Sequence, residues 1–279
     1  MTDTPIPTSA RSNDRRLDLF ATLGEAVVTM PVMWRGAGGV LTVLAALWGA
    51  ALLMAALKGA GGVIGGLTDL ATALVALMTW GAITRIGVAG DLAGARRLGL
   101  GPFGFQMTRI EARLLGAGAL CGLFMIIMLS LLALVALAMF GFAGLNAGAI
   151  RAHDWAAVGA AWKLALLAGV GLIVLGVPVV FAVRLCLFAP ATVGRGQMIS
   201  LTATGLTNGA ILPLLGGLVV CSVPTLACGV LALAFEGGGG LVPVLWVVSY
   251  AGVQAPLTAA FLGIAYRRLE THGMLGAWQ

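Results

Sequence analysis

The sequence predicts an all-α fold: a polytopic transmembrane helix bundle of about six spans, with an N-terminal interfacial amphipathic helix. First, 60% of the 279 residues are hydrophobic and 9% are charged, whereas a soluble domain carries about 25% charged residues. Second, the mean hydropathy is +1.06. Third, the apolar residues form continuous runs instead of alternating. Since lipid offers the backbone no hydrogen bonds, such runs are expected to be helices.

The N-terminal region precedes the spans. Residues 1–13 are polar and contain Pro, Ser and Thr, so we expect a disordered tail. Residues 14–36 are expected to form the amphipathic helix, because apolar and polar side chains alternate there at helical spacing. The apolar side comprises Leu17, Phe20, Leu23, Val27 and Met30, and the polar side Asp18, Thr22, Glu25 and Thr29. Pro31 discourages its continuation. The helix is expected on the inner leaflet, with docking to a cytoplasmic partner as the alternative.

Six runs are long enough to cross ~30 Å of hydrocarbon, which takes about 20 residues. They occupy 38–57, 63–83, 114–140, 164–183, 209–235 and 241–266, within a transmembrane domain of residues 37–268. Residues 269–279 are expected to form a short cytoplasmic tail.

Charge distribution predicts the orientation. The segments between six spans place 13 Lys and Arg residues on one side and three, Lys58, Arg151 and Lys163, on the other. The positive-inside rule therefore predicts that both termini lie in the cytoplasm. The net charge of +6 is attributed to loops facing anionic lipid. No run of Lys or Arg exceeds two residues, so a nucleic-acid partner is not expected.

Two polar residues inside the spans are candidates for a transport site or a structural polar site. Asp69 is the one acidic residue well inside a predicted span, and an intramembrane acid is a functional-site hypothesis by default. The alternative is an interfacial carboxylate that water reaches or that pairs with Lys58 or Lys163. Gln254 shares a helical face with Tyr250 in the last span.

Arg184 follows the fourth span within the stretch VRLCLFAPATV at 183–193. Its long side chain can extend to the headgroups at the cytoplasmic boundary, which makes Arg184 a candidate lipid-headgroup contact. Pro190 then fits a helix end or a bend along the interface.

The residues that catalysis or cofactor binding would need are scarce. The sequence contains no HExxH, GxSxG or CxxC motif, and its cysteines lie in or beside apolar runs. We therefore expect no catalytic, cofactor-binding or metal site, and no cofactor.

Several stretches resemble a bacterial six-span family typified by the YciC-like inner-membrane proteins and the membrane domain attached to some glycerophosphoryl diester phosphodiesterases. They are LDLFATLGEAVVTM at 17–30, VRLCLFAPATV, SLTATGLTNGAILPLLGG at 200–217 and APLTAAFLGIAYRRLE at 255–270. The resemblance implies the six-span layout and a location in a bacterial inner membrane, but the family implies no settled activity. The phosphodiesterase domain is absent from this sequence, so its catalysis is not carried over. The sequence departs from the family after Pro190: the family usually has an acidic residue there, and this sequence has Gly194, Arg195 and Gly196.

These observations favour a non-enzymatic accessory or envelope protein that acts through contacts with lipid or protein. The expected partners are membrane lipids, another membrane protein or a second copy of the chain. The alternative is a small secondary transporter in which Asp69 is the coupling residue and Gln254 a polar neighbour.

Overall fold

The computed structural model describes residues 17–56, 63–144, 147–153, 160–199, 204–205, 207, 209–234 and 241–277. Most of these residues are helical, and they contain no β-strand. The elements are α1 Leu19–Ala56, α2 Val63–Ala89, α3 Leu92–Arg97, the 3-10 turn η2 Pro102–Gly104, α4 Arg109–Ala143, α5 Ala147–Arg151, α6 Ala161–Leu185, α7 Phe188–Arg195, α8 Ile211–Ala234, α9 Leu241–Ser249, the π-helix η4 Tyr250–Gln254 and α10 Ala255–Ala277.

Six helical segments in the described part are long and apolar enough to cross a membrane. They are Leu19–Leu52, Gly65–Ala89, Pro102–Met139, Ala168–Arg195, Ile211–Leu231 and Val244–Glu270. The predicted all-α polytopic bundle is therefore confirmed, and the protein is a multi-pass membrane protein.

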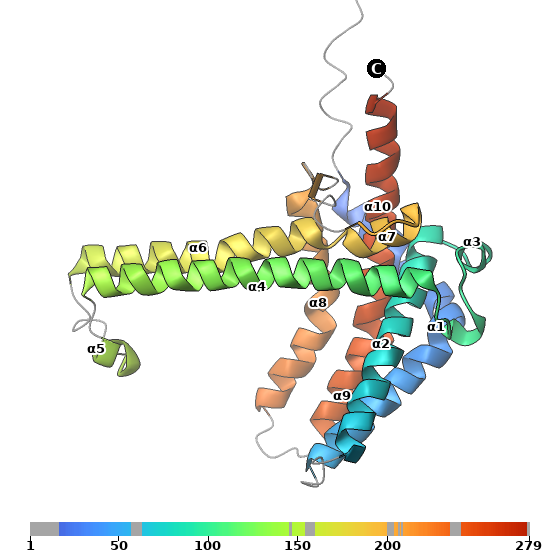
Figure 1. Cartoon of the computed structure of the whole chain (residues 1–279), viewed down its shortest axis with the longest axis horizontal. Helices are drawn as coiled ribbons and strands as arrows, with labels where there is room; N and C mark the ends of the chain where they lie inside the picture. The colour runs from blue at the N-terminus through green and yellow to red at the C-terminus, as the bar shows by residue number, and fades with distance from the viewer. Residues whose placement is uncertain are drawn as a thin grey trace, which may run out of the picture.

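Two groups of helices make up the molecule (Figure 1). In the first, α1, α2 and α10 pack extensively against one another, and α8 and α9 lie beside them. In the second, α4 and α6 run side by side as a hairpin that projects from the bundle, across the direction of α2 and α10. The short helix α7 follows α6 and packs against α2, α4 and α10, so it joins the hairpin to the bundle.

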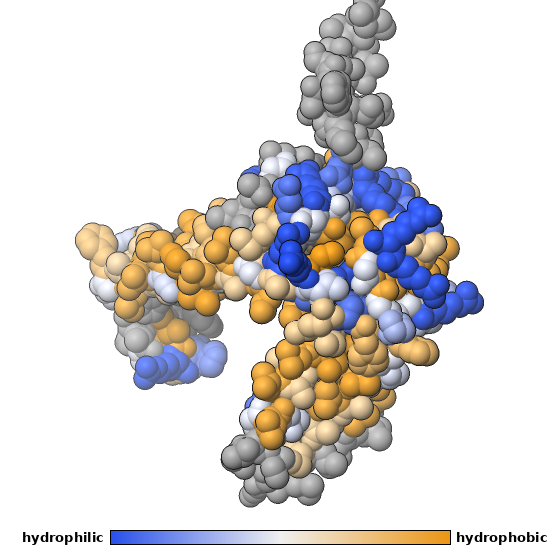
Figure 2. Space-filling model, turned by 45° about the vertical axis from the view of Figure 1, so that its right-hand side comes forward, coloured by the Kyte–Doolittle hydropathy of each residue, from blue (hydrophilic) through white to orange (hydrophobic). Residues whose placement is uncertain are grey.

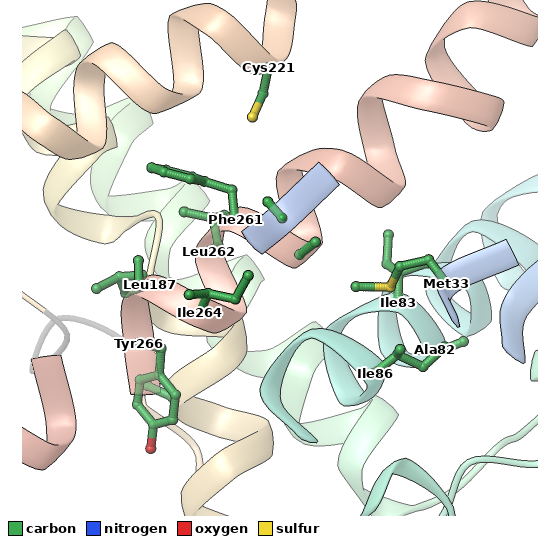
Figure 3. Packing of buried hydrophobic residues seen from close by; sticks show 14 of the residues in the cluster. Met33, Ala82, Ile83, Ile86, Leu187, Cys221, Phe261, Leu262, Ile264 and Tyr266 are labelled. Atoms are coloured by element: carbon green, nitrogen blue, oxygen red, sulfur yellow. The ribbon is translucent and has the colours of Figure 1, made fainter. Parts of the chain in front are cut away.

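The core lies where α1, α2, α7, α8 and α10 meet (Figure 3). Phe261, Leu187 and Met33 are fully buried there. Close approach depends on small residues, as is common between membrane helices. A Cβ added to Gly263 on α10 would lie 2.2 Å from the carbonyl carbon of Gly87 on α2. The backbones of these two helices are therefore in direct contact.

The first helix is longer than expected, because it does not end at Pro31. Residues 19–30 are helical, but α1 continues through Pro31 to Ala56 without a break. A proline inside a helix costs roughly 3 kcal/mol. Packing on either side of it offsets this cost, because Met30 is 7% and Met33 0% exposed. Leucine and methionine side chains buried in this way each contribute about 1.5–3 kcal/mol.

The two faces of this helical segment also differ from the expected division. The polar-side residue Thr22 is fully buried, whereas Phe20 and Val27 on the apolar side are 83% and 59% exposed. The buried Oγ1 of Thr22 donates to the Asp18 carbonyl at 2.5 Å and accepts from the Nη1 of Arg268 on α10 at 3.0 Å. Phe20 and Val27 are thus left for lipid or a partner, whereas Leu17 and Met30 on the same side are buried in the bundle. The inner-leaflet location stays a prediction.

The structure describes most of the C-terminal end of the chain but not the first residues. Residues 1–16, including the expected tail at 1–13, lie outside the described residues, as do 200–203 within the stretch SLTATGLTNGAILPLLGG. At the other end, α10 continues to Ala277. The helix thus continues past residue 269, beyond the end of the candidate span at Glu270. That residues 269–279 form a cytoplasmic tail stays a prediction.

Candidate functional site

A cavity of about 130 Å³ lies between α2, α7, η4 and α10. Thr84 from α2, Pro190 from α7 and Thr258 from α10 line it, together with Tyr250 and Gln254 from the π-helix. Trp80 also lines it and is 42% exposed, so the cavity reaches the surface beside Trp80. Because Trp80 belongs to a membrane-spanning segment, this opening lies on a surface that meets lipid.

The π-helix explains how the last span contributes two polar side chains to one cavity. Between α9 and α10 the backbone widens, and the N–H of Ala255 donates to the carbonyl of Tyr250, five residues earlier. Such insertions are rare and are frequently found at functional sites. Tyr250 and Gln254, which the sequence placed on one face, both line the cavity.

Pro256 gives this segment a second irregularity. A proline has no N–H, so it leaves the carbonyl four residues earlier without its helical partner. That carbonyl belongs to Gly252, and the indole Nε1–H of Trp34 on α1 donates to it at 2.8 Å. The hydrogen bond ties α1 to the widened turn and satisfies the exposed backbone acceptor.

An aromatic cluster forms one side of the site. The ring of Tyr250 is stacked on Trp246 with the ring centroids 5.7 Å apart, and it lies 5.4 Å from the ring of Trp48 on α1. Contacts of this kind each contribute about 0.5–1.5 kcal/mol beyond burial. The cluster holds the Tyr250 side of the cavity against α1.

Gln254 carries the unusual feature of the cavity. Its Oε1 is buried and has no hydrogen-bond partner among the described residues. A buried polar atom without a partner costs about 1–3 kcal/mol. An acceptor kept at that cost inside a cavity is the strongest sign of a ligand site in the described part of the molecule.

Asp69 does not belong to this site. Its side chain is exposed on α2, and eleven positions separate it from Trp80, which is about 16 Å along a helix. Asp69 makes none of the four ion pairs found among the described residues. Lys58, one suggested partner, lies outside the described residues. The structure therefore does not bring Asp69 and Gln254 together.

Arg184 lies in the last turn of α6, and the helix ends one residue later at Leu185. The chain turns at Cys186 and Leu187 and continues as α7, with Pro190 in its first turn. The expected helix end before Pro190 is present. The Arg184 side chain is half-buried, and its Nε has no hydrogen-bond partner among the described residues. Its contact with a lipid headgroup stays a prediction.

A buried ion pair that was not expected from the sequence holds α2 to α4. Arg85 and Glu111 are 0% and 1% exposed, and the Arg85 Nη1 donates to Glu111 Oε1. The guanidinium also donates to Thr108 Oγ1 and to the Leu98 carbonyl, both at 3.0 Å. Glu111 Oε2 accepts from the Thr108 N–H at 2.8 Å, which completes a capping box at the start of α4. The pattern Thr-x-x-Glu before an apolar run was the available sequence signal.

Ion pairs also gather at one end of the bundle. Glu25 on α1 accepts from Arg267 at 3.1 Å and from Arg268 at 2.8 Å, both on α10. Arg195 on α7 donates to Glu270 on α10 at 3.0 Å. Figure 2 shows hydrophilic residues gathered at this end, and an apolar surface over the rest of the bundle and the projecting hairpin.

Comparison with protein families, with curated proteins and with solved structures finds no match to this chain. Among the described residues no group of three His, Cys, Asp or Glu side chains could hold a metal ion. The site is therefore defined by its own geometry: a small neutral cavity with one unsatisfied amide oxygen.

Proposed function

We propose that this multi-pass protein is a non-enzymatic accessory protein of a bacterial inner membrane. It acts through contacts with lipid, with another membrane protein or with a second copy of the chain. Under this proposal both termini are cytoplasmic, and the chain is a relative of the YciC-like six-span proteins that its sequence resembles.

The observation that carries the proposal is the α4–α6 hairpin. In the segment Pro102–Met139, only 6% of the most apolar stretch of 18 residues is buried inside the molecule, although the mean hydropathy of this stretch is 2.8. Leu134 and Leu137 on α4 are 63% and 70% exposed, and Leu175 on α6 is 72% exposed. So much apolar surface outside the bundle has to be covered by lipid or by protein. A hairpin that adds little to the core of its own chain is suited to such contacts.

The secondary-transporter alternative receives less support. It needs a polar site deep in the bundle, but Asp69 is exposed on α2 and does not line the cavity that contains Gln254. The residues that line the cavity are uncharged, so the cavity lacks the ionisable coupling group that the alternative requires.

Site-specific photocrosslinking tests the proposal. A photoreactive amino acid is placed at Leu134 on α4, and a matched one at Leu231 on α8, which is 51% exposed. We expect a discrete protein adduct or an enriched lipid adduct at position 134 and only bulk lipid at 231. Extraction with native lipid and mass spectrometry then identifies what is bound. Equal, non-selective lipid labelling at both positions would contradict a contact role for the hairpin.

A further inference from the structure

We infer that the cavity beside the π-helix binds the neutral hydroxyl end of a membrane lipid, with Gln254 Oε1 accepting a hydrogen bond from that hydroxyl. This goes beyond the proposed function, because the cavity is separate from the α4–α6 hairpin and either assignment can fail alone.

The chemistry of the lining selects a neutral ligand. Thr84, Tyr250, Gln254 and Thr258 supply the polar groups, and the remaining lining is apolar. No charged side chain lines the cavity, so a phosphate or carboxylate would lose its hydration without a counter-charge. A hydroxyl can donate to the buried Oε1 of Gln254 and also accept from a threonine or tyrosine hydroxyl.

The size of the cavity limits how much of the ligand enters. Its volume is about 130 Å³, and an engineered protein cavity of ~150 Å³ holds a benzene molecule. A group of about six heavy atoms, such as a glycerol end, therefore fits inside. The rest of a larger amphiphile would lie outside.

The position of the cavity and its opening indicate that the ligand enters from the bilayer. The cavity opens beside Trp80, within a spanning segment. Trp80 is nine residues from the end of α2 at Ala89, which is about 14 Å along the helix. That end is joined to the polar part of the bundle, since Arg267 donates to the Val88 carbonyl at 3.4 Å. This depth lies below the headgroups, so a charged headgroup would have to leave water to reach it. A lipid whose end is an uncharged hydroxyl carries no such charge, and it can enter the cavity from the hydrocarbon side beside Trp80.

Paired photoreactive probes test the inference on the full chain in nanodiscs. One probe is a monoacylglycerol with a diazirine near the glycerol, and the other is its dimethyl ether, which cannot donate a hydrogen bond. After irradiation, labelled peptides are mapped by mass spectrometry. We expect the alcohol to label the peptides containing Trp80–Thr84 and Tyr250–Thr258 roughly fivefold more than the ether, since one net hydrogen bond is worth about that factor in occupancy. Both probes should label α4 equally.

Two variants sharpen the result. Gln254→Leu should abolish the preference for the alcohol while leaving labelling of α4 unchanged. Ala255→Leu, which fills part of the cavity from α10, should reduce labelling by both probes. If either variant fails to fold, the comparison of the two probes on the unaltered protein still tests whether the cavity prefers a hydroxyl.

Three outcomes would overturn the inference. The first is equal labelling of the cavity peptides by both probes. The second is a preference for the alcohol that survives Gln254→Leu. The third is displacement of the alcohol probe by water-soluble glycerol but not by unlabelled monoacylglycerol, which would assign the cavity to a soluble alcohol. Displacement by monoacylglycerol alone supports the lipid source.

Discussion

Arg85 and Glu111 form an ion pair that is wholly buried between α2 and α4. Removing one partner leaves an unpaired buried charge, which typically costs about 3–5 kcal/mol. We therefore expect Arg85→Ala and Glu111→Ala each to lower the free energy of unfolding by about that amount, measured by denaturant titration in detergent. The double variant Arg85→Met, Glu111→Leu should be less destabilised than either single variant, because it leaves no charge unpaired.

The pair between Arg195 and Glu270 is the matched control. Its side chains are 42% and 24% exposed, and a solvent-exposed pair contributes about 0–1 kcal/mol. Arg195→Ala should therefore have a much smaller effect than Arg85→Ala. Equal effects of the two substitutions would contradict the structural role assigned to the buried pair.

Gly263 lies where α2 and α10 touch through their backbones. A Cβ there would meet the Gly87 carbonyl carbon at 2.2 Å, so the helices must separate. We expect Gly263→Ala to lower the midpoint of thermal unfolding, at a cost of about 1–3 kcal/mol. Gly176→Ala on α6 is the control, because a Cβ at Gly176 meets nothing within 4 Å. If the two substitutions have the same effect, α2 and α10 are not in the contact described.

Asp69 separates the two functions considered for this protein. Because its carboxylate is exposed and does not line the cavity, we expect Asp69→Asn to leave protein level and partner retention unchanged. Proteoliposomes should show no proton-coupled or solute-coupled flux with either protein. A flux that the unaltered protein supports and Asp69→Asn abolishes would instead establish the transporter.

The π-helix η4 depends on a hydrogen bond that crosses between elements. Trp34 donates to the Gly252 carbonyl, whose helical partner is missing because residue 256 is proline. We expect Trp34→Phe to destabilise the protein by about 0.5–1.5 kcal/mol. Pro256→Ala supplies the missing N–H, so the same Trp34→Phe change should cost less in that background. A double-mutant cycle on unfolding free energies measures this coupling, and additive effects would show that the two residues act independently.

At the scale of the elements, the spanning helices could be predicted from the sequence. Six long, continuous apolar runs, with Asp69 as the one acidic residue well inside them, satisfy their backbones in lipid as helices. The six candidate spanning segments follow from that. The prediction that the helix ends near Pro31 was wrong, because the cost of a proline inside a helix is offset by the burial of Met30 and Met33 on either side of it. The π-turn at Tyr250–Gln254 has no propensity signal of its own.

The candidate site was less predictable, because its parts come together only in three dimensions. Gln254 and Tyr250 could be paired from their spacing of four residues. Their meeting with Thr84 and Pro190 depends on how α2 and α7 pack. Arg85 was counted only as a loop charge, since its partner Glu111 is 26 residues away.

For the whole molecule, charge distribution predicts the orientation of the termini independently of the hairpin. With six crossings, 13 Lys and Arg residues face the cytoplasm and Lys58, Arg151 and Lys163 face outward. If α4 and α6 did not cross, Arg151 and Lys163 would join the cytoplasmic side and the asymmetry would increase. Both arrangements place the two termini in the cytoplasm. The location of α5 is what distinguishes them.

The composition of α4 predicts that the hairpin crosses. A helix that lies along a membrane surface needs a polar face, but between Gly116 and Ala143 the sequence offers only Cys121 and Ser130. Because α4 and α6 run across the direction of the bundle (Figure 1), crossing requires the hairpin to tilt relative to α2 and α10. In a variant without native cysteines, we expect Ala152→Cys, next to α5, to react with a membrane-impermeant thiol reagent added outside. Ala93→Cys in α3, which is also exposed, should react only after the membrane is opened. Protection of both positions would mean that the hairpin lies along the inner leaflet and that only the bundle crosses.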